Sequence, residues 1–130
     1  MKLVTFSDSK GKRVGVVSGG GGIVDLSRAD DNLPRDMIGL IAGWDRARST
    51  VERASARAAD FALKSVKLHA PVPRPGKIMA IGLNYADHIA ESGMKTPEQQ
   101  IWFSKMPSAV TGPYADIQLP KVSAALDYEV

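Results

Sequence analysis

A polar cluster follows a short apolar run in the second half of the chain. The segment 84–93 reads NYADHIAESG. His88 and Glu91 are three positions apart, so on a helix they would share one face. A carboxylate beside an imidazole orients the ring, which is the arrangement that a base needs to activate water or to move a proton. The same spacing is common on solvated helix faces, so the pair is a hypothesis for a catalytic dyad.

Helix boundaries explain the other polar residues of this segment. Asn84 is a good N-cap residue, and Asp87, three residues later, completes a pattern that resembles a capping box. Asp87 also favours the positive end of a helix dipole. Gly93 suits the left-handed position that follows a helix. Capping therefore accounts for Asn84, Asp87 and Gly93 and leaves His88 and Glu91 for chemistry.

Two further charged residues lie on predicted strands. Lys105 ends the strand-like IWFSK, and an isolated strand lysine is usually an edge or surface residue. If it points into a pocket, it could bind a carboxylate or stabilise an enolate. Glu129 lies in the final segment LDYEV. A single carboxylate is a weak signal, but a second acid close by would make a pair for a hard metal ion.

A strand, a helix and a second strand must position these side chains. The apolar KIMAIG (77–82) predicts a buried strand that runs directly into the helix, and 101–105 predicts the next strand. Sites are often built where a helix follows a buried strand. The proline-rich segment 71–76 predicts an extended, semi-rigid connector and hence a domain boundary. His69, beside this connector, is interpreted as a partly exposed histidine at a strand end.

The residues before this connector predict a small α/β unit. Segments 2–6 and 13–18 alternate apolar and polar residues and are rich in strand formers, so they predict two strands joined by a turn. Four glycines follow at 19–22. A phosphate-binding loop would need a Lys-Ser/Thr pair and a helix directly after it. Neither follows, so the glycines favour a hairpin connection.

Two helices are predicted after these strands. The first lies in NLPRDMIGLIAGW, with Asn32 or Leu33 at its beginning and Pro34 in its first turn. The second is predicted over 45–64, because apolar residues recur there at helical spacing as far as Phe61 and Ala62. Its arginines lie on the opposite, solvated face.

The amino-acid composition limits the classes of protein to which this chain can belong. The chain has 130 residues, 44% hydrophobic and 24% charged, which is typical of one ordinary soluble domain or a small domain with part of another. No apolar run is long enough to cross a bilayer. Cysteine is absent, so thiolate metal sites are excluded and the cytoplasm is the expected location.

The net charge of the chain is +3, but acidic residues are interleaved with the basic ones and aromatic residues make up only 6%. Nucleic-acid binding is therefore a minor alternative.

Three segments in order, PVPRPGKIMAIGLNYADHIAESG, FSKMPSAVTGP and LDYEV, resemble the fumarylacetoacetate hydrolase family. The resemblance covers most of 66–130 and implies an α+β fold. Residues 1–70 are similar to the small N-terminal α/β accessory domain of the bacterial members. Residues 71–130 resemble the beginning of the family's mixed β-sandwich or roll, which would be incomplete here. We therefore expect an accessory domain over 1–70 and the start of a catalytic domain over 71–130.

The resemblance also implies an activity and roles for the site residues. Members of the family hydrolyse, isomerise or decarboxylate 2-oxo acids and acylpyruvates. His88 and Glu91 match the dyad that activates water or moves a proton, and Lys105 matches a substrate-facing lysine. Glu129 matches the first carboxylate ligand of a Mg²⁺ or Mn²⁺ ion that chelates the substrate's carboxylate and keto oxygen. The expected partner is a small 2-oxo acid, with no nucleic acid and no membrane, and homodimers are usual in the family.

One departure from the family's pattern has consequences for activity. In the family a second glutamate ligand follows DYEV directly and a third acid comes later, whereas this sequence stops at Val130. One carboxylate holds Mg²⁺ poorly, because the ion needs several hard oxygen ligands. We therefore expect the N-terminal portion of a longer enzyme, inactive by itself. The alternative is a non-catalytic fragment that acts as a binding or assembly module.

Overall fold

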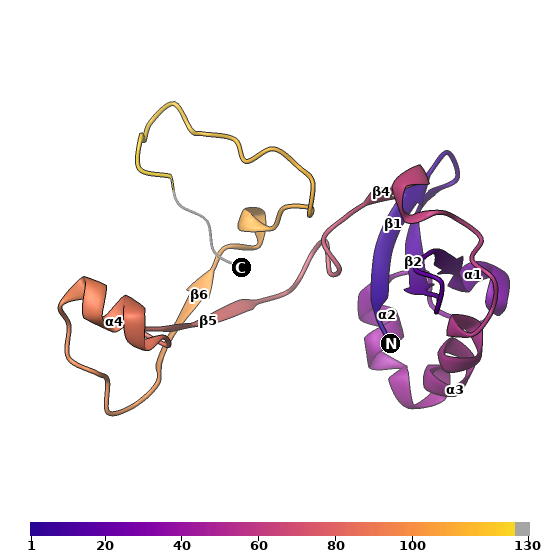
Figure 1. The fold of residues 1–130 in the computed structure, drawn as a ribbon, viewed down its shortest axis with the longest axis horizontal. Helices are drawn as coiled ribbons and strands as arrows, with labels where there is room; N and C mark the ends of the chain where they lie inside the picture. The colour runs from indigo at the N-terminus through magenta and orange to yellow at the C-terminus, as the bar shows by residue number, and fades with distance from the viewer. Residues whose placement is uncertain (127–130) are drawn as a thin grey trace. The chain divides into compact units, whose positions relative to one another are not determined.

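The computed structural model describes residues 1–126 and divides into two compact units. Unit 1 comprises Met1–Pro71 and the described residues from Thr111 onward, and unit 2 comprises Val72–Val110. Each unit combines helices with antiparallel strands (Figure 1), which is consistent with the predicted α+β class. The predicted division into an accessory domain (1–70) and a catalytic domain (71–130) stays a prediction.

Unit 1 is built on a four-stranded antiparallel sheet. The strands lie in the order β3-β2-β1-β4, so the first two strands of the sequence are central. The two strands predicted from alternation are confirmed, with bounds that differ from the predicted ones by one or two residues. The four strands are β1 (Leu3–Asp8), β2 (Gly11–Val17), β3 (Ile23–Asp25) and β4 (Lys67–Leu68).

Tight connections set the register of this sheet. Asp8 pairs with Gly11, so only two residues join β1 to β2. Gly11 has a φ of 98°, a left-handed conformation that only glycine adopts at little cost. The glycines at 19–22 join β2 to β3, where Val17 pairs with Ile23. The hairpin predicted for these glycines is confirmed.

Three helices in unit 1 accompany the sheet (Figure 1). The longest of them has 12 residues, and no described helix is long and apolar enough to span a membrane. The helices are α1 (Leu26–Ala29), α2 (Met37–Ala42), α3 (Trp44–Ser55) and a 3₁₀ turn (Leu63–Ser65). The most deeply buried apolar side chains of sheet and helices are Phe6, Val14, Val16, Ile23, Val24, Leu26, Leu40 and Val51.

The first predicted helix begins later than expected. Its N-cap is Asp36, whose carboxylate accepts a hydrogen bond from the Gly39 N–H at 2.9 Å. The prediction of Asn32 or Leu33 at the beginning is wrong. Asn32 instead donates its backbone N–H to the Asp30 carboxylate at 2.9 Å, in a turn before the helix. Asn32 and Asp36 are both good capping residues, and Asp36, which directly precedes the apolar residues of the helix, is the N-cap.

The second predicted helix ends nine residues earlier than expected. The prediction covered 45–64, whereas α3 ends at Ser55. Phe61 is extended: its N–H donates to the Ile23 carbonyl at 3.1 Å, and its own carbonyl accepts from the Ile23 N–H at 2.9 Å. Its ring also contacts Phe6, with centroids 5.6 Å apart. Pairing with β3 therefore overrides the helical periodicity around Phe61.

Unit 2 contains a two-stranded antiparallel sheet and one short helix. Both predicted strands are confirmed, but β5 is only half-buried rather than buried, and no residue of 72–110 is buried. Ile78 pairs with Lys105 at one end of the sheet, and Gly82 pairs with Ile101 at the other. The elements are β5 (Ile78–Gly82), α4 (Ala86–Ser92), β6 (Ile101–Lys105) and a 3₁₀ turn (Pro107–Ala109).

Candidate functional site

The helix that carries the candidate dyad begins one residue later than predicted. Tyr85, extended at φ −121° and ψ 135°, is the N-cap of α4 and makes no side-chain capping bond, so the prediction of Asn84 as N-cap is wrong. Leu83 has a φ of 51°, and this left-handed residue turns the chain between β5 and α4. The C-cap prediction is confirmed: Gly93 has a φ of 66°, and its N–H donates to the Ala90 carbonyl.

His88 and Glu91 lie on α4 three residues apart. Both side chains are exposed. Among the described residues, no hydrogen bond or ion pair joins either side chain to another group. The helix therefore presents an imidazole and a carboxylate together to solvent, where both could contact a small molecule. Their action as a catalytic dyad stays a prediction.

Lys105 lies at the other end of the two-stranded sheet. It pairs with Ile78, the first residue of β5, whereas α4 follows the last residue of that strand (Figure 1). Four strand residues, roughly 13 Å, separate the two ends. The Lys105 side chain is half-buried, and its ammonium lies 5.3 Å from the centre of the Phe103 ring. The structure brings His88 and Glu91 onto one helix but leaves Lys105 apart from them.

The predicted metal ligand Glu129 lies outside the described residues. Within 1–126, no group of three or more His, Asp or Glu side chains could hold a metal ion. The side chains that the structure describes therefore do not by themselves form a site for Mg²⁺ or Mn²⁺. The predicted metal site stays a prediction that rests on Glu129 and on ligands from outside the chain.

The strongest electrostatic cluster lies in unit 1, around Arg13. The Arg13 guanidinium donates two bonds to the Asp8 carboxylate, at 2.7 and 2.9 Å, and its Nε donates to Asp25 at 2.6 Å. It also lies 4.6 Å from the Phe6 ring centre and 5.6 Å from that of Phe61. Both Arg13 and Asp25 are buried. This cluster closes the end of the β1–β2 hairpin.

The cluster changes the pKa values of its members. Hydrogen bonds from Arg13 and then from the Lys10 backbone N–H hold the pKa of Asp8 far below its usual range. The Asp8 carboxylate in turn raises the pKa of Arg13. Burial raises the pKa of Asp25, but hydrogen bonds from Ser27 and Arg13 outweigh burial, so the net shift is downward. All three groups are therefore charged at neutral pH.

Sequence reasoning did not predict this cluster. Asp8 and Asp25 stand at strand ends, where turn formation explains acidic residues equally well. Arg13 begins a predicted strand, and its neighbours in the sequence do not indicate that its side chain will be buried. Asp60 extends the cluster by accepting the Asp25 N–H at 2.9 Å and pairing with Arg28 at 3.1 Å. These contacts join residues more than 30 positions apart and arise only from the fold.

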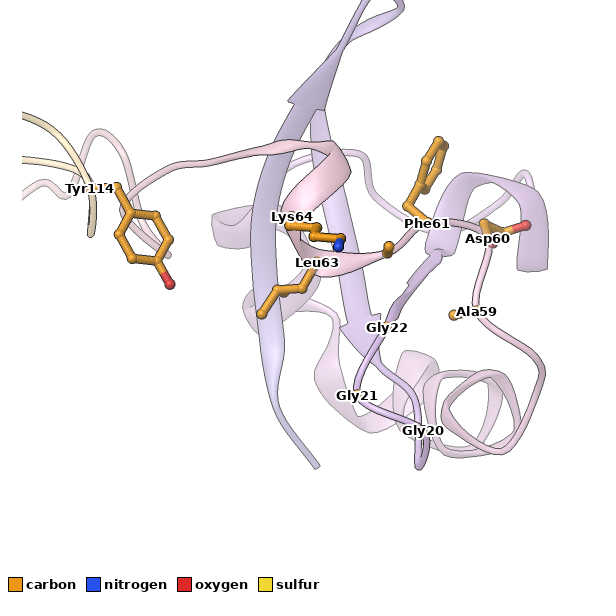
Figure 2. Close-up of a pocket in the computed structure, with 10 residues that line it drawn as sticks. Gly20, Gly21, Gly22, Ala59, Asp60, Phe61, Leu63, Lys64 and Tyr114 are labelled. Atoms are coloured by element: carbon orange, nitrogen blue, oxygen red, sulfur yellow. The ribbon is translucent and has the colours of Figure 1, made fainter.

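A hollow of about 690 Å³ lies beside the glycine hairpin of unit 1. Figure 2 shows the glycine run next to the segment from Ala59 to Lys64. The Asp60 carboxylate in its wall is already bonded to the Asp25 N–H and to Arg28. The described residues contain no buried side-chain polar atom without a hydrogen-bond partner. The hollow thus offers no unused buried polar group for a ligand.

Comparison with known proteins identifies a protein family that part of this chain matches. Residues 77–130 match the family described as "Fumarylacetoacetate (FAA) hydrolase C-terminal". Over its full length the chain is 41% identical to the mitochondrial oxaloacetate tautomerase Fahd2a of Rattus norvegicus and covers 43% of that protein. It is 36% identical to the mitochondrial oxaloacetate tautomerase FAHD2A of Homo sapiens, again covering 43%. The chain thus spans less than half the length of these relatives.

Solved structures with similar folds lead to the same family. One is the maleylpyruvate hydrolase of Sphingobium sp. SYK-6 in complex with manganese(II) and pyruvate, with a TM-score of 0.66 and 35% identity over 93% of this chain and 43% of that one. Another is the fumarylacetoacetate hydrolase of Exiguobacterium antarcticum, with a TM-score of 0.57 and 26% identity over 91% and 40%. The family match over residues 77–130 and these similar structures both indicate the fumarylacetoacetate hydrolase family.

Proposed function

We propose that this chain is part of a metal-dependent enzyme that hydrolyses, isomerises or decarboxylates 2-oxo acids or acylpyruvates. The similarity of the full chain to proteins named oxaloacetate tautomerase carries this proposal. A similar structure that holds pyruvate, a 2-oxo acid, supports the same substrate class. The chain spans 43% of the first of these relatives, so the activity is proposed for the longer protein.

His88 is the proposed base. In the isomerisation of a 2-oxo acid, the imidazole takes a proton from the carbon next to the carbonyl. The electron pair of that C–H bond forms a C=C bond, and the carbonyl oxygen gains a proton to give the enol. In hydrolysis the same imidazole takes a proton from water as the oxygen attacks a carbonyl carbon. The exposure of His88 on α4 supports this role, since a substrate can reach the ring.

Glu91 is the proposed partner of that base. One helical turn from His88, its carboxylate can accept a hydrogen bond from the imidazolium and stabilise its positive charge. Lys105 is proposed to bind a substrate carboxylate through its ammonium. The family resemblance supports this role, whereas the position of Lys105 opposite Ile78 at the far end of β5 does not.

A divalent ion, Mg²⁺ or Mn²⁺, is the proposed cofactor, with Glu129 as one ligand. The manganese(II) ion in the maleylpyruvate hydrolase structure supports this choice. Residues 1–126 contain no cluster that could hold the ion, so the proton transfers above are assigned to His88 and Glu91 only. A homodimer and a cytoplasmic location remain predictions from the sequence.

Replacing the base tests the catalytic proposal. In a protein that carries this chain together with a complete family domain, His88→Ala should lower the rate of oxaloacetate keto–enol exchange at least about 100-fold, a typical contribution of a general base. Mn²⁺ affinity, measured by isothermal titration, should stay the same. Glu98→Gln, an exposed carboxylate outside α4, is the control and should keep the rate. Full activity in the His88 variant would contradict the proposal, and loss of Mn²⁺ binding would make His88 a ligand.

The second candidate function is a non-catalytic binding or assembly module. Trp102 and Met79 are 56% and 52% exposed on the two-stranded sheet, and no residue of 72–110 is buried. Two strands without a covering layer are marginally stable, which favours association with another protein surface. Isothermal titration of the 130-residue chain with Mn²⁺ separates the candidates. Specific binding in the micromolar range would contradict the module.

A further inference from the structure

Three residues on adjacent strands form a row across one face of the unit 1 sheet. Ser7 of β1 pairs with Lys12 of β2 on one side and with Lys67 of β4 on the other. Directly paired residues have their Cβ atoms roughly 5 Å apart and point to the same face of a sheet. The hydroxyl of Ser7 therefore lies between two lysine side chains. Both lysines are exposed, and Ser7 is half-buried.

His69 completes this group from the end of β4. It lies two positions after Lys67, and its backbone N–H donates to the Thr5 carbonyl at 2.9 Å, so the chain continues alongside β1. The imidazole Nε2 and the Ser7 Oγ are hydrogen-bonded at 2.7 Å. The ring is half-buried. Four polar side chains that are separated by up to 62 positions in the sequence thus meet on one face.

The charge of this group is not balanced by a nearby acid. Among the described residues, no ion pair joins Lys12 or Lys67 to a carboxylate. Asp8 follows Ser7 on the opposite face, where Arg13 binds its carboxylate. Lys12 of β2 and Lys67 of β4 lie on either side of β1, two strand spacings or roughly 10 Å apart, so an anion between them would be attracted to both ammonium groups.

The hydrogen bonds of this site depend on pH through the protonation state of the His69 imidazole. Burial, followed by the charges of Lys12 and Lys67, lowers the pKa of His69. The ring is then neutral at neutral pH, and Ser7 can donate its hydroxyl hydrogen to Nε2. Once the ring is protonated, Nε2 becomes the donor and the hydroxyl hydrogen of Ser7 is free to bond elsewhere. Protonation therefore adds a positive charge and also releases a hydroxyl donor.

We propose that Ser7, Lys12, Lys67 and His69 form a binding site for a doubly charged oxyanion, and that binding is accompanied by proton uptake at His69. The two ammonium groups supply attraction, and the hydroxyl and the imidazolium supply directed hydrogen bonds. Phosphate esters and small dicarboxylates both have this chemistry. The site uses none of the residues assigned to catalysis in the proposed function, so either proposal can fail without the other.

NMR titration of the two imidazoles tests the site in the intact chain. The sequence contains only two histidines, so exposed His88 serves as an internal control. The pH titration is run in sodium sulfate and in sodium chloride of equal ionic strength. Because an anion that prefers the protonated ring raises its pKa, the pKa of His69 should rise by about one pH unit in sulfate. This rise corresponds to about tenfold tighter binding to the protonated form. The imidazole resonances of His88, which lies outside the site, should show no difference between the two salts.

Charge-removing variants test whether the row itself holds the anion. Lys12→Gln and Lys67→Gln should each reduce the sulfate-minus-chloride difference at His69 by at least half. Lys64→Gln, an exposed lysine of the same unit outside the row, should leave it unchanged. Amide chemical-shift dispersion checks that each variant is folded. The comparison uses the difference between salts, because removing a lysine also changes the pKa of His69 in chloride.

The outcomes separate the possible ligands. A larger response to sulfate than to malonate assigns the site to tetrahedral anions such as phosphate esters, and the reverse assigns it to dicarboxylates. No response of His69 to either anion would overturn the proposal. An equal response of His69 and His88 would also overturn it, because screening of the whole surface then explains the shift.

Discussion

Arg13 illustrates how a charged residue can belong to a core. All three nitrogens of its guanidinium donate hydrogen bonds, to the carboxylates of Asp8 and Asp25 and to the Gly11 carbonyl. The guanidinium also lies over the rings of Phe6 and Phe61. Burial of an arginine is tolerated only when its donors are satisfied, because an unpaired buried charge is strongly destabilising. The same contacts hold β1, β2 and β3 in register at one end of the sheet.

Removing this arginine should destabilise the chain strongly. Arg13→Met preserves the length of the side chain but removes the buried cation that is paired with the Asp25 carboxylate. We expect a loss of about 3–5 kcal/mol in the free energy of unfolding, measured by urea denaturation. Arg48→Met is the control, because Arg48 forms an exposed pair with Glu52, and exposed pairs of this kind contribute little to stability. Equal losses in the two variants would contradict a structural role for the buried cluster.

The pH dependence gives a second measurement on the same variant. The pKa of Asp25 is lowered from its ordinary value of 3.8, so the unfolded chain takes up a proton first as the pH falls. The stability from this carboxylate is therefore present above about pH 4 and is lost as the pH falls below it. The difference in urea midpoint between the native chain and Arg13→Met should shrink over this range. A difference that stays constant down to pH 2 would contradict the assignment.

At the scale of elements, the glycines of the hairpin at 19–22 differ in why the fold needs them: Gly21 has a φ of 83°, whereas Gly22 is closely packed. A Cβ on Gly22 would collide with Ala59 and would lie 2.8 Å from the Phe61 carbonyl oxygen, whereas a Cβ on Gly20 would meet nothing within 4 Å. The glycines of this run are therefore not equivalent. Gly22 permits β3 to pair with the segment around Phe61, and that pairing is what ends the predicted second helix early.

A pair of alanine variants tests this distinction. Gly22→Ala should lower the free energy of unfolding by about 1–3 kcal/mol, the usual cost of overpacking. Gly20→Ala, the matched control, should be neutral or slightly stabilising, since alanine restricts the unfolded chain. Thermal unfolding followed by circular dichroism measures both. A Gly20 variant as unstable as the Gly22 variant would mean that the whole hairpin, not the contact with Phe61, needs glycine.

At the scale of the whole molecule, burial differs between the two units. Unit 1 contains all of the buried residues, including Val14 and Val16 at the centre of its sheet. Among the residues that the structure describes, β5 and β6 of unit 2 are paired only with each other. Two paired strands without a core are marginally stable in water. The chain therefore combines a well-packed unit with one whose sheet lacks a covering layer.

Hydrogen exchange should report this difference directly. The amides of Val14 and Val16 should exchange at least about 100-fold more slowly than those of Ala80 and Phe103, because local opening costs less where few apolar groups are buried. Exchange at pH 7 followed by heteronuclear NMR gives the rates residue by residue. Similar protection of the amides from exchange in both sheets would contradict the predicted difference. It would indicate that another surface covers the sheet of unit 2, for example through self-association.

Local rules determined much of the chain from sequence alone. Alternation predicted β1 and β2, short apolar or strand-like runs predicted β5 and β6, and Gly93 ended α4 as expected, because these features depend on neighbours in the sequence. Spacing likewise placed His88 and Glu91 on one helix. The motifs around them were sufficient to indicate the family.

Tertiary structure decided what depends on distant partners. The end of α3, the burial of Arg13 and the meeting of Ser7 with His69 each require residues far apart in sequence. No local preference encodes such a pairing, because its free energy comes from burial and hydrogen bonds that exist only once the sheet has formed. The sequence thus determined the elements and the family, and the assembled sheet decided which charges are buried and which lie together on its face.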